Sequence, residues 1–221
     1  MFHDRLIHET CEDQDALFRI PFVHAAVEGT LDLATYHRFL GQAYHHVRET
    51  VPLLMACGAR LPMRYEWLRG AVGNYIEEEH GHHEWILDDL RRSGGDADAV
   101  QGGRPDVPCE VMLAYAWDMV NRRNPIGMFG MVHVLEGASV RGATRAATRL
   151  AQQLELPETA FSYLSSHGDL DVGHVEFFRG LMNRIEDRED RDCIVRSSHV
   201  CARLYGDVFR ALVPAASEVM S

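Results

Sequence analysis

The sequence predicts an all-α fold, a single bundle of about seven helices that spans residues 1–221. Apolar residues recur at spacings of three and four along almost the whole chain, which is the pattern of the buried face of a helix. No segment shows the sustained alternation with β-branched residues that is typical of a strand. With 46% hydrophobic and 25% charged residues among 221, the chain has the composition of an ordinary globular domain.

Proline, glycine and capping residues divide the first half of the chain into three expected helices. The first covers about 13–29, with an interruption near Pro21. The second covers about 33–60, with Asp32 as its N-cap and Pro52 as a residue that can kink it. The third covers about 62–93 and is stopped by Gly94 and Gly95.

The second half begins with the most evident loop of the sequence, the segment 94–108 (GGDADAVQGGRPDVP). Two prolines, Pro125 and Pro157, mark later boundaries, because the residue before a proline is disfavoured in a helix. Further helices are therefore expected at about 109–122, 126–154, 158–184 and 188–212.

Charge and cysteine content restrict the partners and the compartment. The formal net charge of −11 disfavours nucleic acids and anionic membranes, which attract clusters of lysine and arginine. The five cysteines have no Cys-x-x-Cys spacing, so neither a disulfide framework nor a thiolate zinc site is indicated. No secretory signal and no apolar run of membrane-spanning length is recognisable. We expect a cytoplasmic protein that acts on a small molecule, either as a monomer or as a homodimer.

Three segments place polar residues where the helical pattern requires an apolar face: 76–85 (IEEEHGHHEW), 131–139 (MVHVLEGAS) and 167–174 (HGDLDVGH). Glu79 and His82 are spaced i, i+3, so one helix could present both to the same ion. Glu136 lies within an apolar run, where a lone buried carboxylate is costly unless it is paired or binds a metal. On the third segment the spacing i, i+4, i+7 puts three groups on one side of a helix: His167, Asp171 and His174.

Together these residues offer three carboxylates, three imidazoles and no thiolate, a donor set that favours iron or manganese over structural zinc. Two ions that share bridging carboxylates would use all six groups, whereas a single ion would leave carboxylates without a counter-charge. Gly168 and Gly173 are poor helix formers, so coordination would have to stabilise the segment that contains them.

Other polar residues of these segments have simpler explanations. A solvated helix face accounts for most of the charge in the first segment, at Glu77, Glu78, His80, His83 and Glu84. A core position suits His133, and packing or pocket lining suits His24, His45 and His46. Asp89, seven residues after His82, could orient that imidazole or be a surface charge.

The order of these motifs resembles the haem-oxygenase-like diiron oxidases, relatives in fold of thiaminase II (TenA), of pyrroloquinoline-quinone synthase (PqqC) and of CADD-type proteins. The resemblance consists of Glu-x-x-His, a lone Glu in an LEG context and His-x-x-x-Asp-x-x-His, and it extends from FLGQAYHHV at residue 39 to HVEFF at 178. It implies the haem-oxygenase-like bundle and six iron ligands, which are Glu79, His82, Glu136, His167, Asp171 and His174. In the first segment, Glu78 with His82 and Glu79 with His83 are competing pairs.

The resemblance also implies an activity. Two Fe(II) ions per chain, or manganese, would activate O₂ as a co-substrate and oxidise an amino acid, amine or carboxylic acid by N-oxygenation, desaturation or oxidative carbon-carbon cleavage. The alternatives are a metal-independent enzyme like TenA or PqqC, a haem oxygenase with His24 as axial ligand, and a small-ligand-binding bundle. A substrate carboxylate could be anchored by Tyr44, Arg141, Arg145 or Arg179.

Overall fold

The computed structural model describes residues 1–168 and 172–212, and this part of the chain is helical and contains no strand. The all-α prediction is confirmed. None of the described helices is long and apolar enough to cross a membrane. The α-helices are α1 (Phe2–Phe18), α2 (Pro21–Glu28), α3 (Leu33–Val47), α4 (Thr50–Arg60), α5 (Glu66–Glu79), α6 (His82–Arg92), α7 (Ala97–Gly102), α8 (Val107–Arg122), α9 (Met128–Gln153), α10 (Ser162–Gly168), α11 (Val172–Asn183) and α12 (Arg188–Leu212).

The described part of the chain thus has twelve α-helices where the sequence predicts about seven, because short breaks divide the long helices. Gly29 ends α2 with φ of 70° and Gly81 separates α5 from α6 with φ of 90°, a region that L residues with a Cβ rarely adopt. The expected kink at Pro52 is a break two residues earlier, since α4 begins at Thr50. The expected loop 94–108 contains α7, whose N-cap Asp96 accepts a hydrogen bond from the Ala99 N–H at 2.9 Å.

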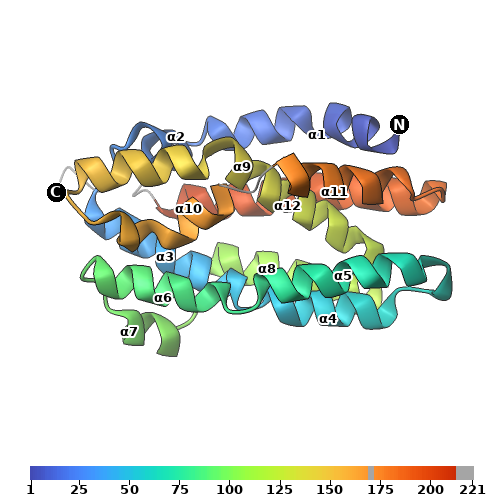
Figure 1. Cartoon of the computed structure of the whole chain (residues 1–221), viewed down its shortest axis with the longest axis horizontal. Helices are drawn as coiled ribbons and strands as arrows, with labels where there is room; N and C mark the ends of the chain where they lie inside the picture. The colour runs from blue at the N-terminus through green and yellow to red at the C-terminus, as the bar shows by residue number, and fades with distance from the viewer. Residues whose placement is uncertain (169–171, 213–221) are drawn as a thin grey trace.

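Helix α12 is the centre of the packing and contacts α1, α2, α3, α8 and α9. In Figure 1, α1 and α2 run along the upper edge of the bundle, α5 and α6 run along the lower part, and α9, α10 and α11 lie between them. Helix α9 contacts α10, α12, α2 and α1. It can approach α12 closely at Gly130, where an added Cβ would lie 2.5 Å from the Ile194 carbonyl oxygen and 2.8 Å from the Ser198 nitrogen.

Replacing Gly130 by alanine is expected to lower the free energy of unfolding by about 1–3 kcal/mol, because backbone atoms of α12 cannot move aside cheaply. The matched control is Gly73→Ala on α5, where an added Cβ meets nothing within 4 Å. This change should stabilise the protein by up to about 1 kcal/mol, the helix preference of alanine over glycine. Urea unfolding of both variants tests the prediction, and equal effects of the two changes would contradict the close contact of α9 and α12.

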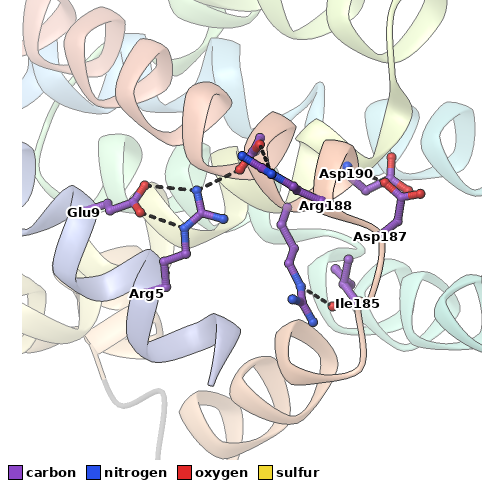
Figure 2. A network of polar contacts seen from close by, with 8 residues as sticks. Arg5, Glu9, Ile185, Asp187, Arg188 and Asp190 are labelled. Carbon is purple, nitrogen blue, oxygen red and sulfur yellow. Dashed lines mark hydrogen bonds and ion pairs between the residues drawn. The ribbon is translucent and has the colours of Figure 1, made fainter.

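The start of α12 is fixed by polar contacts to α1 and to the preceding loop (Figure 2). Arg5 on α1 donates to Glu9 at 2.7 Å and to Asp192 at 2.7 Å, and the Asp190 N–H donates to the Asp187 carboxylate at 3.0 Å. The buried carboxylate of Asp190 accepts from Tyr65, Asn124 and Arg64 at 2.6, 2.6 and 2.9 Å. Although burial opposes its ionisation, these bonds lower the pKa of Asp190 below its usual value. The network therefore ties the start of α12 to α1, to the turn Met63–Tyr65 that precedes α5 and to Asn124 before α9.

Candidate metal centre

Glu79 and His82 lie on either side of a helix break. The sequence predicts one helix through both residues, and this is wrong, because Gly81 takes a left-handed conformation after α5 ends at Glu79. Across the break, His82 Nδ1 and Glu79 Oε2 are 3.1 Å apart. Their side chains are only 15% and 23% exposed. Glu78 is exposed. Of the pairs that the sequence suggested, the structure brings Glu79 and His82 together.

Glu136 is a half-buried carboxylate of α9 with no cationic partner among the described residues. No hydrogen bond or ion pair to it is formed within that part of the chain. The pKa of Glu136 is raised to about 8, mainly by burial and in addition by the nearby carboxylates of Glu79 and Glu78. Burial and the same three glutamates also raise the pKa of Tyr75. Glu136 therefore lies near two other glutamates and has no cationic partner of its own among the described residues, as at a site that binds a cation.

These carboxylates face a cavity of about 70 Å³, which we call the acid cavity. Glu79 and Glu136 line it together with three tyrosines, the buried His46, Thr50 and Ser139, while methionine, valine and leucine side chains form the rest of its wall. Its lining residues are His46, Val47, Thr50, Leu54, Tyr75, Glu79, Met128, Met131, Val132, Leu135, Glu136, Ser139, Tyr163 and Tyr205.

The other three predicted ligands lie on the segment 167–174. Asp171 is outside the described residues, and so are the side chains of His167 and His174, which lie on α10 and α11. Among the described side chains, no group of three or more potential ligands is assembled. The six-residue set therefore stays a prediction, with Glu79, His82 and Glu136 placed and the remainder undescribed.

Two helices that flank this segment are nevertheless held against the acid cavity. Helix α10 contacts α9 and α6, which carry Glu136 and His82. On α11, the Phe177 ring lies 5.9 Å from the ring of Tyr75, a cavity residue, and Phe178 stacks on His133 with centroids 6.0 Å apart. The fold thus brings the end of α10 and the start of α11 to the same region as the placed ligands.

Asp89 does not orient His82, and it is not a surface charge. Its carboxylate is 0% exposed and accepts three hydrogen bonds at the start of α10, from Ser162 Oγ at 2.5 Å, the Ser162 N–H at 3.0 Å and the Tyr163 N–H at 2.8 Å. Asp89 therefore acts as a buried helix cap that joins α6 to α10. The periodicity correctly puts it on an inward face but cannot show which neighbouring helix it meets.

The contacts of the other histidines show where each of them lies. His133 is buried and donates through Nε2 to Thr10 at 2.8 Å, because the Thr10 hydroxyl itself donates to the Leu6 carbonyl. Burial lowers the pKa of His133 to about 4, so it is neutral at pH 7. His46 faces the acid cavity and its Nδ1 bonds the Gln42 carbonyl at 3.1 Å, whereas His45 packs beside Tyr44. His24 is exposed and does not line the acid cavity.

The suggested substrate anchors have other partners. Arg141 and Arg145 are exposed and pair with Asp15 and Glu28, each at 2.7 Å, and Arg179 pairs with Glu176. Tyr44 is buried beneath Arg48, whose guanidinium lies 5.7 Å from its ring centre. None of the four lines the acid cavity. The tyrosines that do line it, Tyr75, Tyr163 and Tyr205, were not singled out, since their spacing is that of ordinary core residues.

Comparison with known proteins gives the class of the chain. Residues 37–206 match the model of the iron-containing redox enzymes, so the chain belongs to that family. No curated protein matches it in sequence.

Three solved structures share its fold. The first is a domain of unknown function with a heme oxygenase-like fold from Shewanella denitrificans OS217, with TM-score 0.83, 20% identity, and 95% of this chain and 90% of that chain covered. A TenA homologue from Pseudomonas syringae pv. tomato DC3000 has TM-score 0.79, 9% identity and coverage of 96% and 92%. A CADD-like protein from Nostoc punctiforme PCC 73102 has TM-score 0.72, 16% identity and coverage of 94% and 96%. The haem-oxygenase-like fold is thereby confirmed.

Proposed function

We propose that the protein is a non-haem diiron oxidase that uses O₂ to oxidise a small organic substrate. Membership of the iron-containing redox enzymes supports iron in general. The observation that carries the proposal is the carboxylate of Glu136, which shares an acid cavity with Glu79 and has no cationic partner among the described residues. Oxygen and imidazole donors of this kind suit iron.

In this proposal Glu79, His82 and Glu136 hold the two ions together with His167, Asp171 and His174. When bound, ferrous iron supplies the electrons that activate dioxygen. The three carboxylates balance the charge of the metal. Because the pKa of Glu136 is about 8 without metal, this carboxyl has to release its proton when it becomes a ligand.

The residues around the acid cavity control access and orientation. Met128, Met131 and Leu135 form an apolar wall that keeps water away from the reaction centre. The hydroxyl groups of Tyr75 and Tyr205 can hydrogen-bond to a polar substrate group, and burial raises the pKa of both, so they stay protonated. The chain itself thus contributes metal binding, a dry environment and substrate orientation.

Oxygen uptake by the iron-loaded protein tests this function. Protein loaded anaerobically with Fe(II) should consume O₂ when it is mixed with aerated buffer, and Glu79→Gln should slow this uptake by about tenfold or more through loss of iron. Glu78→Gln is the matched control, because the neighbouring Glu78 is exposed and should be dispensable. Full O₂ uptake by Glu79→Gln would contradict the assignment, as would a Soret band on haem titration with no binding of free iron.

A further inference from the structure

Trp85 lies on the first turn of α6, three residues after the candidate ligand His82, so the two side chains project from the same side of the helix. Their rings are in contact, with the centroids 4.2 Å apart and the planes inclined by 31°. This geometry is close to that of offset-stacked aromatic rings. On its other side His82 meets Glu79 at 3.1 Å, so the indole is joined through one imidazole to a carboxylate of the acid cavity.

Trp85 also reaches the surface of the protein. It is 38% exposed, whereas the side chain of His82 is 15% exposed. Among the described residues, Trp85 Nε1 has no hydrogen-bond acceptor, so its proton can pass to water. The indole therefore connects solvent with a candidate iron ligand.

The structure describes all three tryptophans of the sequence, and the other two lie elsewhere. Trp67 packs against Tyr65, and the Arg184 guanidinium lies 3.9 Å from its ring centre. Trp117 donates through Nε1 to Glu49 at 3.1 Å. Neither lines the acid cavity. Trp67 and Trp117 are therefore internal controls for any chemistry that depends on contact with His82.

We propose that Trp85 is a protective redox relay, whose indole supplies electrons through the His82 imidazole when O₂ is reduced without a substrate. This inference rests on the proposed function and adds a safeguard to the same site. Indole is among the side chains that lose one electron most easily, and the stacked imidazole gives this electron a short path to the metal centre. An oxidising site has to exclude competing reactions, which here means oxidation of its own ligands.

The electron count defines the step. In productive turnover, the reduction of O₂ to the level of water takes two electrons from the ferrous pair and two from the substrate. Without substrate, the indole of Trp85 supplies the missing two electrons one after the other. Each time it loses an electron through His82 and the Nε1 proton to water, and a one-electron donor in solution, such as ascorbate, returns an electron and a proton. Without a donor, the indole loses both electrons, takes the oxygen of a water molecule with release of two protons, and becomes hydroxytryptophan.

Peptide mass spectrometry of the full-length protein tests the relay by a product other than oxidised substrate. Protein loaded anaerobically with Fe(II) and then exposed to O₂ without substrate should gain one oxygen atom at Trp85 and none at Trp67 or Trp117. Ascorbate should prevent this gain, and protein loaded with Zn(II), which has no redox chemistry, should not show it. Met63, which is 77% exposed, reports diffusible oxidants and should stay unmodified.

Two variants separate electron transfer from packing. Trp85→Phe and Trp85→Tyr both keep a ring against His82, but of the two only tyrosine readily gives up an electron. After repeated cycles of Fe(II) loading and exposure to O₂ without substrate, the iron that Trp85→Phe can rebind should fall below about half that of the parent, because oxidation then reaches the ligands. Trp85→Tyr should rebind as much iron as the parent.

Consumption of O₂ with no oxygen gain at Trp85 would overturn the relay and leave the proposed function intact. The same holds if the gain is confined to Met128 and Met131 of the acid cavity, or if the Phe and Tyr variants lose iron binding equally. Failure of the parent protein to bind iron and consume O₂ would overturn both the relay and the proposed function.

Discussion

Glu136→Gln is expected to abolish most iron binding and, at the same time, to stabilise the metal-free protein. Glutamine has nearly the same shape but cannot carry the negative charge with which Glu136 would hold iron. The same charge is unfavourable in the empty protein, because Glu136 lies in the acid cavity beside Glu79 and no described residue neutralises it. The change should thus separate metal binding from stability.

The pH dependence of stability gives the size of this effect. The pKa of Glu136 is about 8 in the folded protein and 4.5 in the unfolded chain, so the folded state binds the proton more tightly. The free energy of unfolding therefore falls as the pH rises from about 4.5 to about 8, and at pH 7 the loss is about 3 kcal/mol. Glu136→Gln should remove this loss, so that its gain over the parent grows between pH 5 and pH 8.

Urea unfolding across this pH range, with a chelator present, measures the gain, and metal analysis of the same variant measures the iron. The control is Glu78→Gln, which removes an exposed charge from the same region. This change should have little effect on the free energy of unfolding or on the iron content. A Glu136→Gln protein that is no more stable than the parent at pH 8 would contradict the raised pKa of the half-buried Glu136 carboxyl.

Asp89→Ala is expected to destabilise the protein by about 3 kcal/mol. Alanine leaves the Ser162 and Tyr163 N–H groups at the start of α10 without their buried acceptor, and each such group costs about 1–3 kcal/mol. Because α10 carries His167 near its C-terminal end, we also expect a lower iron content at saturating Fe(II).

Asp88→Ala is the matched control for Asp89. Asp88 is the preceding residue of α6 and is half exposed, and among the described residues its ion pairs are with Arg91 and Arg92 on the same helix. Its loss should cost less than about 1 kcal/mol. Thermal unfolding of both variants in the metal-free form measures this difference. Similar losses of stability for Asp88→Ala and Asp89→Ala would show that the buried cap of α10 contributes little to the stability of the fold.

Hydrophobic periodicity was sufficient to predict the helical class, and capping signals were sufficient for several boundaries. The expected helix 188–212 coincides with α12, and Asp32 caps α3 by accepting from the Thr35 N–H at 2.6 Å. The break at Gly81 was not foreseen. A single glycine inside a helical pattern costs only about 1 kcal/mol and is often tolerated, so its presence alone does not predict a helix break.

The residue types of the candidate site could be predicted from the sequence, but their arrangement in space could not. The cost of burying Glu136 in an apolar run is visible in the sequence, and the raised pKa in the structure has the same physical origin. The role of Asp89 was not predictable, because the periodicity of α6 gives its direction but not the helix that it meets. The apolar cavity between α2 and α9 was equally hidden, since small and aromatic residues of α1, α2 and α9 line it only after the helices pack.

The iron content per chain is the most direct test of the central claim. Protein produced in iron-rich medium and freed of loosely bound metal should contain about two iron ions per chain, and both Asp171→Ala and Glu136→Ala should contain well below one. Parent protein without iron, or variants that keep about two ions per chain, would contradict the diiron site.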